Sequence, residues 1–408
     1  MVNVAVLGYG TIGSGVVEVL QTNTEVIAQR AGEEIAVKYI LDLRDFPGDP
    51  NADKIVHDYD IIDKDEDVQV VVECMGGVEP AYTFVKRALL NGRSVATSNK
   101  ELVAKHGAEL IAIAHEKNIN FLFEASVGGG IPIIRPLVQC LTADVIEEVS
   151  GILNGTTNYM LTRMKEEGIS FEEALKEAQE KGYAELHPEA DVEGYDACRK
   201  IAILTSLAYG MQVDYEDIHT EGITKITATD IKYAKAMDRE IKLLATSKKG
   251  PKGYTAIVAP FLVPVSHPLY AVSGVFNAIF VHGNVLGDAM FYGSGAGKLP
   301  TASAVVADIM EAVENADHNV PLGWSSERLV IADQKTSVHR YFVRVEGTGT
   351  ELEQAAAAAF GGAELVKLDS LNDEFALLTG EMSEAAYAEC AAAFEKTAKI
   401  RQRIRAEF

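Results

Sequence analysis

The 408-residue sequence is poor in cysteine, and the few cysteines that it contains are scattered. Four are present, with no CxxC pair and no histidine spaced to share a metal with them: Cys74, Cys140, Cys198 and Cys390. A disulfide framework or a cysteine–histidine zinc site needs closer, regular spacing. We therefore expect buried, reduced thiols and a reducing cellular compartment.

Long hydrophobic runs and positive charge are also scarce. No apolar stretch reaches the ~20 residues that a membrane helix needs, and Met1-Val2-Asn3 lacks the basic residues that open a signal peptide. The chain carries 37 lysines and arginines against 60 aspartates and glutamates, a formal charge of −23. Such a surface repels nucleic-acid phosphates and anionic lipids. We expect a cytoplasmic protein that binds neither nucleic acid nor membrane.

Residues 1–130 alternate short β-branched runs with amphipathic stretches. Five runs predict strands because they are almost continuously apolar, as parallel strands buried on both faces are: Val2–Leu7, Ala36–Leu41, Val68–Glu73, Ser94–Thr97 and Asn120–Glu124. Helices are predicted between them at Ile12–Arg30, Pro80–Asn91 and Leu102–Lys117. This alternation indicates an α/β fold with a Rossmann-type, doubly wound parallel sheet.

Residues 131–320 mix helical and strand patterns, which indicates a second, α+β domain. The predicted segments are two helices and three strands: Phe171–Lys181, Gly194–Tyr209, Ile146–Leu153, Thr255–Leu262 and Val275–Val281. The last helix of this region, Thr301–Val313, is expected to pack back on the first domain.

Residues 336–408 form a third, smaller unit. Three strands and two helices are predicted in it: Tyr341–Glu346, Glu351–Phe360, Glu364–Leu368, Glu374–Thr379 and Ser383–Phe394. Their order resembles the βαββαβ pattern of ACT regulatory domains.

A glycine-rich loop directly follows the first predicted strand and directly precedes a helix. Its sequence is Gly8-Tyr9-Gly10-Thr11-Ile12-Gly13, a GxGxxG motif. Gly8 permits the tight turn, Gly10 lets the backbone approach a pyrophosphate, and Gly13 allows close helix–strand packing. The helix N-terminus supplies amide donors to the anion. A turn that needs only one positive φ would not explain three glycines at this spacing, so we predict that this loop binds a dinucleotide.

The residue expected to bind the cofactor ribose is Asp42, at the end of the second predicted strand. It lies farther from the glycine loop than the usual ~20 residues, because the intervening helical stretch is long. Arg44 is the only nearby cation that could accept a 2′-phosphate. The sequence therefore favours NAD and leaves NADP open.

Two lysines and a carboxylate are candidates for proton transfer. Asp196 and Lys200 are four residues apart on a predicted helix, so their side chains share one face. Lys100 follows a strand, in a loop at the edge where the cofactor crevice of such sheets lies. Two lysines that meet at one oxygen would lower each other's pKa, which suits an acid–base role. Taken alone, Asp196 and Lys200 could equally form a surface ion pair of ~0.3–0.5 kcal/mol.

Six further motifs occur in a fixed order along the chain. They are Glu73-Cys74-Met75-Gly76-Gly77, Thr97-Ser98-Asn99-Lys100, Glu124-Ala125-Ser126-Val127-Gly128-Gly129-Gly130-Ile131-Pro132, Asn154-Gly155-Thr156-Thr157-Asn158, Gly182-Tyr183-Ala184-Glu185, and Asp191-Val192-Glu193-Gly194-Tyr195-Asp196-Ala197-Cys198-Arg199-Lys200. Together they resemble homoserine dehydrogenase, from residue 2 to about residue 315. The resemblance implies NAD(P)-dependent interconversion of homoserine and aspartate semialdehyde, in the biosynthesis of threonine, isoleucine and methionine.

The resemblance also implies roles for individual residues. Lys200 matches the proton donor and acceptor, Lys100 the lysine near the nicotinamide and reacting group, and Asp196 the carboxylate that positions the substrate and relays protons. Glu185 is implied to hold the substrate ammonium, in a pocket that is lined by Asp191, Tyr183, Gly155 and Thr156. The residues implied beside the cofactor, besides the glycine loop, Asp42 and Lys100, are Met75, Gly76, Thr97, Ser98 and Gly297. His187 lies in the Glu185 segment, where the family has an acidic residue, and is assigned no role.

The segment from Glu124 to Ile131 resembles the family's monovalent cation site. The resemblance implies that Glu124 and the carbonyls of Val127, Gly129 and Ile131 coordinate sodium or potassium. Oxygen ligands of this kind suit hard cations. A glycine-rich turn between two domains is the alternative interpretation of the same segment.

The C-terminal unit departs from the usual ACT pattern. An acidic-x-x-Gly-x-Leu turn commonly follows the first strand of ACT domains, whereas this chain has Glu346-Gly347-Thr348-Gly349-Thr350-Glu351-Leu352 there. We therefore expect the ACT-like fold without feedback by threonine. The family resemblance implies a homodimer through the second domain, or a tetramer if the C-terminal units pair.

Two other functions fit part of the sequence. Another amino-acid or semialdehyde dehydrogenase would keep the glycine loop but would not need Glu185, Asp196 and Lys200 at this spacing. A non-catalytic dinucleotide sensor would not need Lys100 or Lys200, and both are present. The prediction is therefore an enzyme that acts on homoserine.

Overall fold

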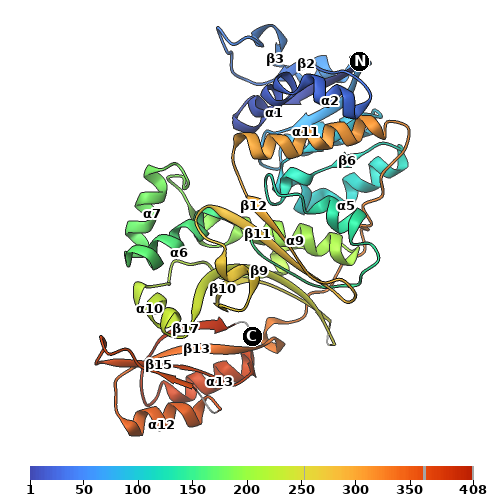
Figure 1. Cartoon of the computed structure of the whole chain (residues 1–408). Helices are drawn as coiled ribbons and strands as arrows, with labels where there is room; N and C mark the ends of the chain where they lie inside the picture. The colour runs from blue at the N-terminus through green and yellow to red at the C-terminus, as the bar shows by residue number, and fades with distance from the viewer. Residues whose placement is uncertain (252, 362–363, 407–408) are drawn as a thin grey trace.

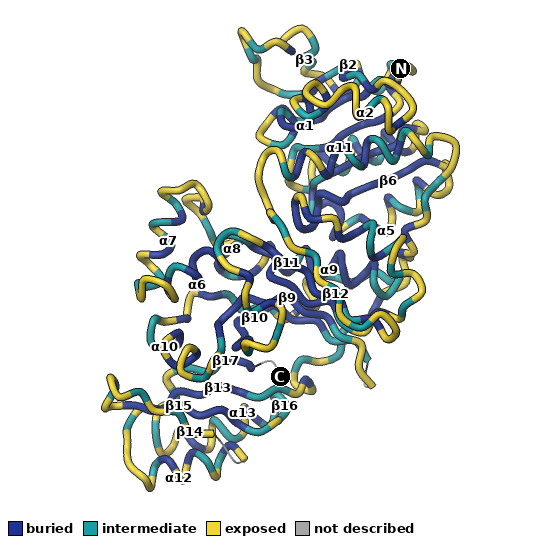
Figure 2. The backbone as a smooth tube through the Cα atoms, in the orientation of Figure 1, coloured by how far each residue is buried: buried dark blue, intermediate teal, exposed yellow. Residues whose placement is uncertain are grey.

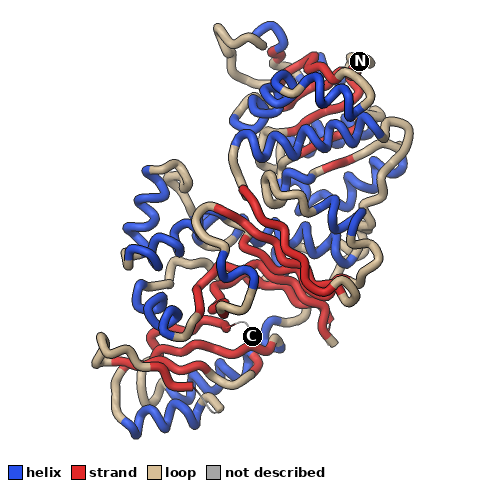
Figure 3. The backbone as a smooth tube through the Cα atoms, viewed as in Figure 1, coloured by secondary structure: helices blue, strands red, loops and turns tan. Residues whose placement is uncertain are grey.

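The computed structural model describes residues 1–251, 253–361 and 364–406. Two sheets dominate these residues, a six-stranded sheet near the N-terminus and an eleven-stranded sheet that extends to the C-terminus (Figures 1 and 3). In the described parts of the chain, no helix is long and apolar enough to cross a bilayer.

The first sheet is parallel throughout, with the strand order β3-β2-β1-β4-β5-β6. Its strands are β1 (Val2–Leu7), β2 (Ile35–Leu41), β3 (Ile55–Val56), β4 (Val68–Glu73), β5 (Ser94–Thr97) and β6 (Phe121–Leu122). The order reverses between β1 and β4, and ligands of such sheets bind beyond the carboxyl ends of the strands at this point. The predicted Rossmann-type sheet is confirmed, and the glycine loop lies at this crevice.

Helices cover both faces of the parallel sheet. One face packs on α1 (Thr11–Thr22), α2 (Thr24–Ala31) and α11 (Lys298–Glu314), and the other on α4 (Ala81–Leu90) and α5 (Lys100–Glu116), while a short α3 spans Tyr59–Asp63. Along β1, Val4 and Val6 belong to the first core, and Ala5 and Leu7 to the second. This alternation explains why the strand is apolar without a break. As predicted, the chain returns in α11 to pack against α1. We call this sheet and its helices the N-terminal unit.

The single helix predicted over Ile12–Arg30 is wrong, because the structure breaks it at Asn23. That residue has φ −110° and ψ 22°, outside the helical region. The hydroxyl of Thr24, the first residue of α2, donates to the carbonyl of Leu20 at 2.7 Å. Threonine side chains can bind the backbone of the preceding turn in this way, which a periodicity of apolar residues does not reveal.

The second sheet has the strand order β12-β11-β7-β9-β10-β17-β13-β15-β14, with β8 paired to β10 and β16 to β13. In its central part the strands are β7 (Ile146–Ile152), β8 (His219–Thr220), β9 (Arg239–Gly250), β10 (Gly253–Pro264), β11 (Phe276–Gly283) and β12 (Gly287–Ser294). Its helices are α6 (Gly155–Glu167), α7 (Phe171–Glu180), α8 (Glu189–Val192), α9 (Tyr195–Tyr209) and α10 (Ala228–Ala236). We call these elements the central unit. The predicted segments of this region are confirmed, whereas β9, β12, α6 and α10 were not predicted.

The C-terminal part follows the expected βαββαβ order with one additional two-residue strand before its second helix, and it does not form a separate sheet. Its elements are β13 (Val338–Glu346), α12 (Thr350–Ala359), β14 (Glu364–Val366), β15 (Glu374–Leu378), β16 (Met382–Ser383), α13 (Glu384–Phe394) and β17 (Ile400–Ala406). The last strand pairs in parallel with β10 through Phe261–Arg405 and Leu262–Ala406. The C-terminal unit thus continues the central sheet, a pairing that no local pattern indicates (Figure 1).

A connecting segment from α11 to β13 crosses the junction between the N-terminal and central units. Trp324, the only tryptophan of the chain, is buried in it with its ring against the backbone of Gly107 in α5. Its indole N–H donates to the side-chain oxygen of Gln212 at 3.1 Å, and the side-chain nitrogen of Gln212 donates to the Ala104 carbonyl at 3.3 Å. These contacts connect α5 of the N-terminal unit to the segment that directly follows α9 in the central unit.

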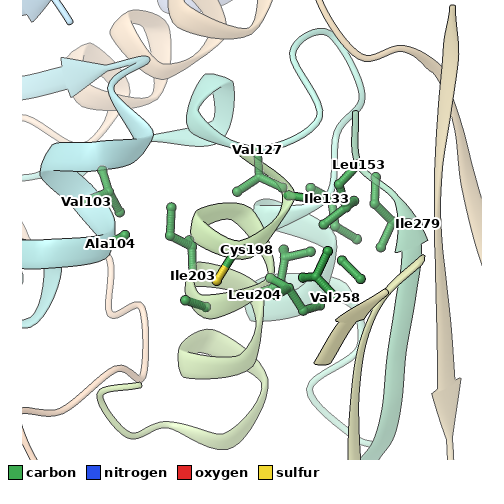
Figure 4. Close-up of a cluster of buried hydrophobic side chains, with 14 of the residues drawn as sticks. Val103, Ala104, Val127, Ile133, Leu153, Cys198, Ile203, Leu204, Val258 and Ile279 are labelled. Atoms are coloured by element: carbon green, nitrogen blue, oxygen red, sulfur yellow. The ribbon is translucent and has the colours of Figure 1, made fainter. Parts of the chain in front are cut away.

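The core is continuous between these two units, as the buried segments in Figure 2 indicate. Figure 4 shows Val103 and Ala104 of α5 on one side of α9, with Val258 and Ile279 of the central sheet on the other. Cys198 of α9 is buried among them, Cys74 and Cys390 are half-buried, and all four cysteines are free thiols. The expectation that every thiol is buried is wrong for Cys140, which is exposed at the end of a short π-helical turn.

Candidate active site

A cleft of about 650 Å³ lies between the N-terminal and central units. Twelve of the residues predicted for the site line it: Ile12, Ser98, Lys100, Gly129, Gly155, Thr156, Tyr183, Glu185, Asp191, Asp196, Lys200 and Gly297. His187, Glu101, Arg199 and Asn154, to which the sequence analysis gave no role, also line the cleft. The structure therefore brings most of the predicted substrate and proton-transfer residues to one place.

Asp196 lies between the two lysines at the floor of this cleft. Its Oδ2 accepts a hydrogen bond from Lys200 Nζ at 2.7 Å, and its Oδ1 lies 2.9 Å from Lys100 Nζ. Lys200 Nζ also donates to the carbonyl of Leu153 at 2.8 Å. The side chains of Lys200 and Asp196 are only 11% and 7% exposed, which excludes the surface ion pair that their spacing alone allowed.

Lys100 is the first residue of α5, not part of a loop as predicted. The helix begins there because Asn99 caps it, with its side-chain oxygen accepting from the Leu102 amide at 3.1 Å. Burial opposes the charge on Lys100, but the attraction of Asp196 outweighs burial and raises the pKa of the lysine. The expected lowering of the Lys100 pKa by Lys200 is therefore wrong, because a carboxylate lies between the two ammonium groups.

The same arrangement keeps Asp196 ionised. Burial alone would raise the pKa of this carboxyl group, but Lys200 and Lys100 hold the pKa well below its usual range. The floor of the cleft thus carries two ammonium groups on one carboxylate. Such a group can hold a substrate oxygen and deliver a proton to it.

Asn154 organises this centre, and the sequence analysis quoted it without a role. Its side-chain nitrogen donates to Asp196 Oδ2 at 2.9 Å and to Asp191 Oδ1 at 2.7 Å. Its side-chain oxygen accepts from the amide of Thr157 at 2.9 Å and so caps α6. Asparagine before glycine, between a predicted strand and polar residues, was the available signal for the cap. The two carboxylates that it contacts lie about 40 residues away, so its second role depends on the tertiary structure.

The predicted substrate residues line the same cleft. Thr156 donates its hydroxyl to the carbonyl of Tyr183 at 2.6 Å, and the Tyr183 ring meets Tyr159 edge-on. A Cβ at Gly155 would lie 2.7 Å from the carbonyl oxygen of Val275, so only glycine fits at the start of α6. Burial raises the pKa of Asp191. Glu185 is exposed within the cleft, where a carboxylate can meet a substrate ammonium.

The glycine loop has the geometry that its three glycines predict. Gly8 has φ +92°, a left-handed conformation that disfavours other residues. A Cβ at Gly13 would lie 1.9 Å from the carbonyl oxygen of Gly8, whereas a Cβ at Gly10 would meet no atom within 4 Å. Thr11 and Ile12 begin α1, so their amides lie at the helix N-terminus. The backbone at Gly10 is therefore open to close approach, beside amides that can donate to an anion.

Asp42 directly follows β2, at the edge of the sheet where a cofactor ribose would bind. Its carboxylate accepts from the amide of Tyr9 at 2.9 Å and from the side chain of Arg44 at 3.0 Å through both oxygens. The Arg44 guanidinium holds the pKa of Asp42 well below its usual range. A carboxylate and a guanidinium are thus both available at the ribose position, and the guanidinium is largely exposed.

Glu73 links the ends of β4 and β5 and is a second residue that the sequence analysis quoted without a role. It is buried, and burial raises its pKa. Its carboxylate accepts from the amide of Met75 at 2.7 Å and from the hydroxyl of Thr97 at 2.6 Å. Met75, Gly76, Thr97 and Ser98 therefore lie together beyond the ends of these strands, and Ser98 lines the cleft.

The Glu124 side chain already has protein partners. The predicted strand at Asn120–Glu124 ends at Leu122, and Glu124 begins a short 3-10 helix. Its carboxylate accepts from the backbone amides of Ile133, Ile134 and Arg135 at 2.6, 2.8 and 2.9 Å. Arg135 also binds Asp308 and Glu311 of α11, which joins the two units. The segment also offers main-chain carbonyls as potential cation ligands, and Gly128 and Gly129 turn its backbone with φ +73° and +56°.

Two sequence families match the two regions of the chain whose units form the cleft. The family described as "Homoserine dehydrogenase, NAD binding domain" matches residues 8–124, and the family described as "Homoserine dehydrogenase" matches residues 132–310. The homoserine dehydrogenase of Neisseria gonorrhoeae is 39% identical over 91% of this chain and 87% of its own. That of Bacillus subtilis is 43% identical over 77% of this chain and 73% of its own.

Solved structures show the same similarity. A homoserine dehydrogenase from Thiobacillus denitrificans has a TM-score of 0.91 and 35% identity, over 100% of this chain and 98% of its own. A hyperthermophilic archaeal homoserine dehydrogenase in complex with NADPH has a TM-score of 0.65 and 28% identity, over 76% of this chain and 97% of its own.

Proposed function

Because the chain belongs to the homoserine dehydrogenase family, we propose how its residues catalyse the reaction of that family. The protein is an NAD(P)-dependent oxidoreductase of amino-acid biosynthesis that interconverts L-homoserine and L-aspartate 4-semialdehyde. The observation that carries the proposal is the contact of Lys100 and Lys200 with the two oxygens of Asp196 in the cleft.

Lys200 is the proposed proton donor in the direction of semialdehyde reduction. When bound, the nicotinamide supplies the hydride to the carbonyl carbon. The Lys200 ammonium gives its proton to the carbonyl oxygen, and the Lys100 ammonium stabilises the negative charge that develops there. Asp196 orients both lysines and relays the proton that recharges Lys200. In the direction of homoserine oxidation, Lys200 accepts the hydroxyl proton.

The part of the cleft beside the two lysines is the proposed substrate pocket. The Glu185 carboxylate holds the substrate ammonium, and Asp191, Tyr183, Gly155 and Thr156 shape the space around the amino acid. This places the side-chain oxygen of the substrate toward Lys200. It also leaves the proposed cofactor site on the N-terminal unit, formed by Gly8, Tyr9, Gly10, Thr11, Ile12, Gly13, Asp42, Met75, Gly76, Thr97, Ser98 and Gly297.

We propose that NAD is preferred, since the Asp42 carboxylate can accept hydrogen bonds from both ribose hydroxyls when the exposed Arg44 side chain turns away from it. The Arg44 side chain, which binds the Asp42 carboxylate, could instead bind a 2′-phosphate. We therefore propose that NADP is also a substrate. A sodium or potassium ion is proposed at Glu124 and the carbonyls of Val127, Gly129 and Ile131. We further propose three domains: a cofactor domain at residues 1–130, a catalytic domain at residues 131–320 and an ACT-like domain at residues 336–408. The proposed assembly is a homodimer or tetramer in the cytoplasm.

The roles of the lysines are tested by Lys200→Ala, with Lys176→Ala on the exposed face of α7 as the control. Absorbance of reduced nicotinamide is followed with homoserine and either NAD or NADP. We expect Lys200→Ala to lower kcat by roughly 10²–10⁴-fold while cofactor affinity is kept, and the control to match the wild type. Turnover of Lys200→Ala close to the wild type would refute the role of Lys200. The NAD-to-NADP ratio of the wild type measures the preference.

A further inference from the structure

Beside the two lysines, their sequence neighbours form a second ion pair across the cleft. Glu101 follows Lys100 in α5 of the N-terminal unit, and Arg199 precedes Lys200 in α9 of the central unit. The Arg199 Nη2 atom lies 3.5 Å from Glu101 Oε1, and both residues line the cleft. Two oppositely oriented pairs, Lys100–Asp196 and Glu101–Arg199, therefore join α5 to α9 at the reaction centre.

The Glu101–Arg199 ion pair lies where it can affect the geometry of the Lys100–Asp196 ion pair. The Arg199 guanidinium is held over the ring of Tyr215 at 5.7 Å from its centre, so it has a fixed position. Without Arg199, the Glu101 carboxylate would lose its ion-pair partner on α9 and could draw Lys100 away from Asp196. Without Glu101, the guanidinium could compete with Lys100 for Asp196. Each partner thus keeps the other from disturbing the shared carboxylate.

We propose that Glu101 and Arg199 are positioning residues for the reaction, because their ion pair holds Lys100 and Lys200 on opposite oxygens of Asp196. The proposal rests on the roles assigned above to the two lysines. Glu101 and Arg199 are not proposed to contact the nicotinamide or to donate or accept the transferred proton. Their effect is exerted through α5 and α9, which meet only when the two units pack together.

The charged groups that face Lys100 predict a distinctive pH dependence of kcat for variants of Glu101 and Arg199. From α9 it faces Asp196, Lys200 and Arg199, from α8 Asp191, and from its own helix Glu101. The nearest ion pair with α4 is Lys86–Glu109, roughly 13 Å farther along α5 at 1.5 Å per residue. Among the groups that raise the pKa of Lys100 against burial, Glu101 follows Asp196.

Removing the two charges should therefore shift the titration of the coupled lysines in opposite directions. Glu101→Gln removes a negative charge and lowers the apparent pKa of the pair, whereas Arg199→Gln removes a positive charge and raises it. In homoserine oxidation, the acidic limb of kcat then moves to lower pH in Glu101→Gln and to higher pH in Arg199→Gln. The double variant returns near the wild-type limb. A purely structural contribution would not produce opposite signs.

The experiment measures kcat and KM for homoserine against pH in the intact protein for five variants and the wild type. The variants are Glu101→Gln, Arg199→Gln, their double variant, and the controls Lys86→Gln and Glu109→Gln. The control pair also joins α5 to a neighbour, at 2.7 Å, with side chains 36% and 43% exposed against 24% and 37% for Arg199 and Glu101. The controls therefore report a general loosening of α5.

We expect each cleft variant to lower kcat/KM by roughly three- to tenfold, with the double variant no worse than either single one. The controls should keep the wild-type pH profile. Shifts of the same sign, additive losses, or cleft variants that match the controls would overturn the proposal. If a glutamine variant does not fold, Arg199→Lys and Glu101→Asp serve as the test, since they keep the charge and should keep the pH limb. Full turnover in Lys200→Ala would instead refute the role of the lysine itself.

Discussion

Asn154 offers a way to separate the capping of a helix from the orientation of the reaction centre. Asn154→Ala removes both the bond to the Thr157 amide and the two bonds to Asp191 and Asp196. Asn154→Ser keeps an oxygen that can cap α6, because serine is as good at this position as asparagine. Its shorter side chain cannot reach the two carboxylates. Comparing the two variants therefore isolates the carboxylate bonds.

The magnitudes follow from the lost hydrogen bonds. A helix cap contributes about 1 kcal/mol, and a hydrogen bond to a charged group about 1.5–3 kcal/mol. Only part of the second contribution is lost in stability, since Asp196 keeps Lys100 and Lys200 as partners. We expect Asn154→Ala to lower the free energy of unfolding by about 3 kcal/mol and Asn154→Ser by about 2 kcal/mol. Both should lower kcat by roughly tenfold or more, the rate equivalent of one charge-assisted bond.

The assay combines urea denaturation with steady-state kinetics on each purified variant. Ser170→Ala is the control, because Ser170 caps α7 through the Glu173 amide and contacts neither lysine nor carboxylate of the cleft. It should lose about 1 kcal/mol of stability with kcat unchanged. If Asn154→Ser had the wild-type kcat, or if Ser170→Ala lost activity to the same extent, the assigned role of Asn154 would be refuted.

Two further predictions concern the glycine loop and the C-terminal unit. Gly13→Ala should destabilise the fold because its Cβ would lie 1.9 Å from the Gly8 carbonyl, whereas Gly10→Ala, with no atom within 4 Å, should fold normally and bind NAD(P) more weakly. Calorimetric titration and urea denaturation distinguish the two, and equal stabilities would contradict the packing argument. Burial, aided by Arg405, lowers the pKa of His339 from 6.5 to about 4. The native state keeps this histidine neutral while the unfolded chain binds a proton, so stability falls as the pH drops from about 6.5 to 4. His339→Gln should flatten this decline in urea midpoints between pH 7 and pH 5, and an unchanged slope would contradict the assignment.

Much of the N-terminal unit could be predicted from the sequence, because its signals are local. Continuous apolar runs define β1, β2, β4 and β5, and three glycines at fixed spacing define the loop after β1. The four-residue spacing of Asp196 and Lys200 likewise places both on one helix face. Local patterns failed where a polar side chain binds the backbone, as at Thr24, and where a cap moves the start of a helix, as at Lys100.

The sequence by itself determined many of the strands, the glycine loop and the helix face that Lys200 shares with Asp196. The tertiary structure decided that Lys100, about 100 residues earlier, contacts the other oxygen of Asp196, and that Asn154 orients it. It also decided that Glu124 binds three amides and that β17 extends the central sheet through β10. These features depend on how two separately patterned units pack against each other. Periodicity reports the face on which a side chain lies, whereas its partner on another unit is set by the shape and charge of the whole interface.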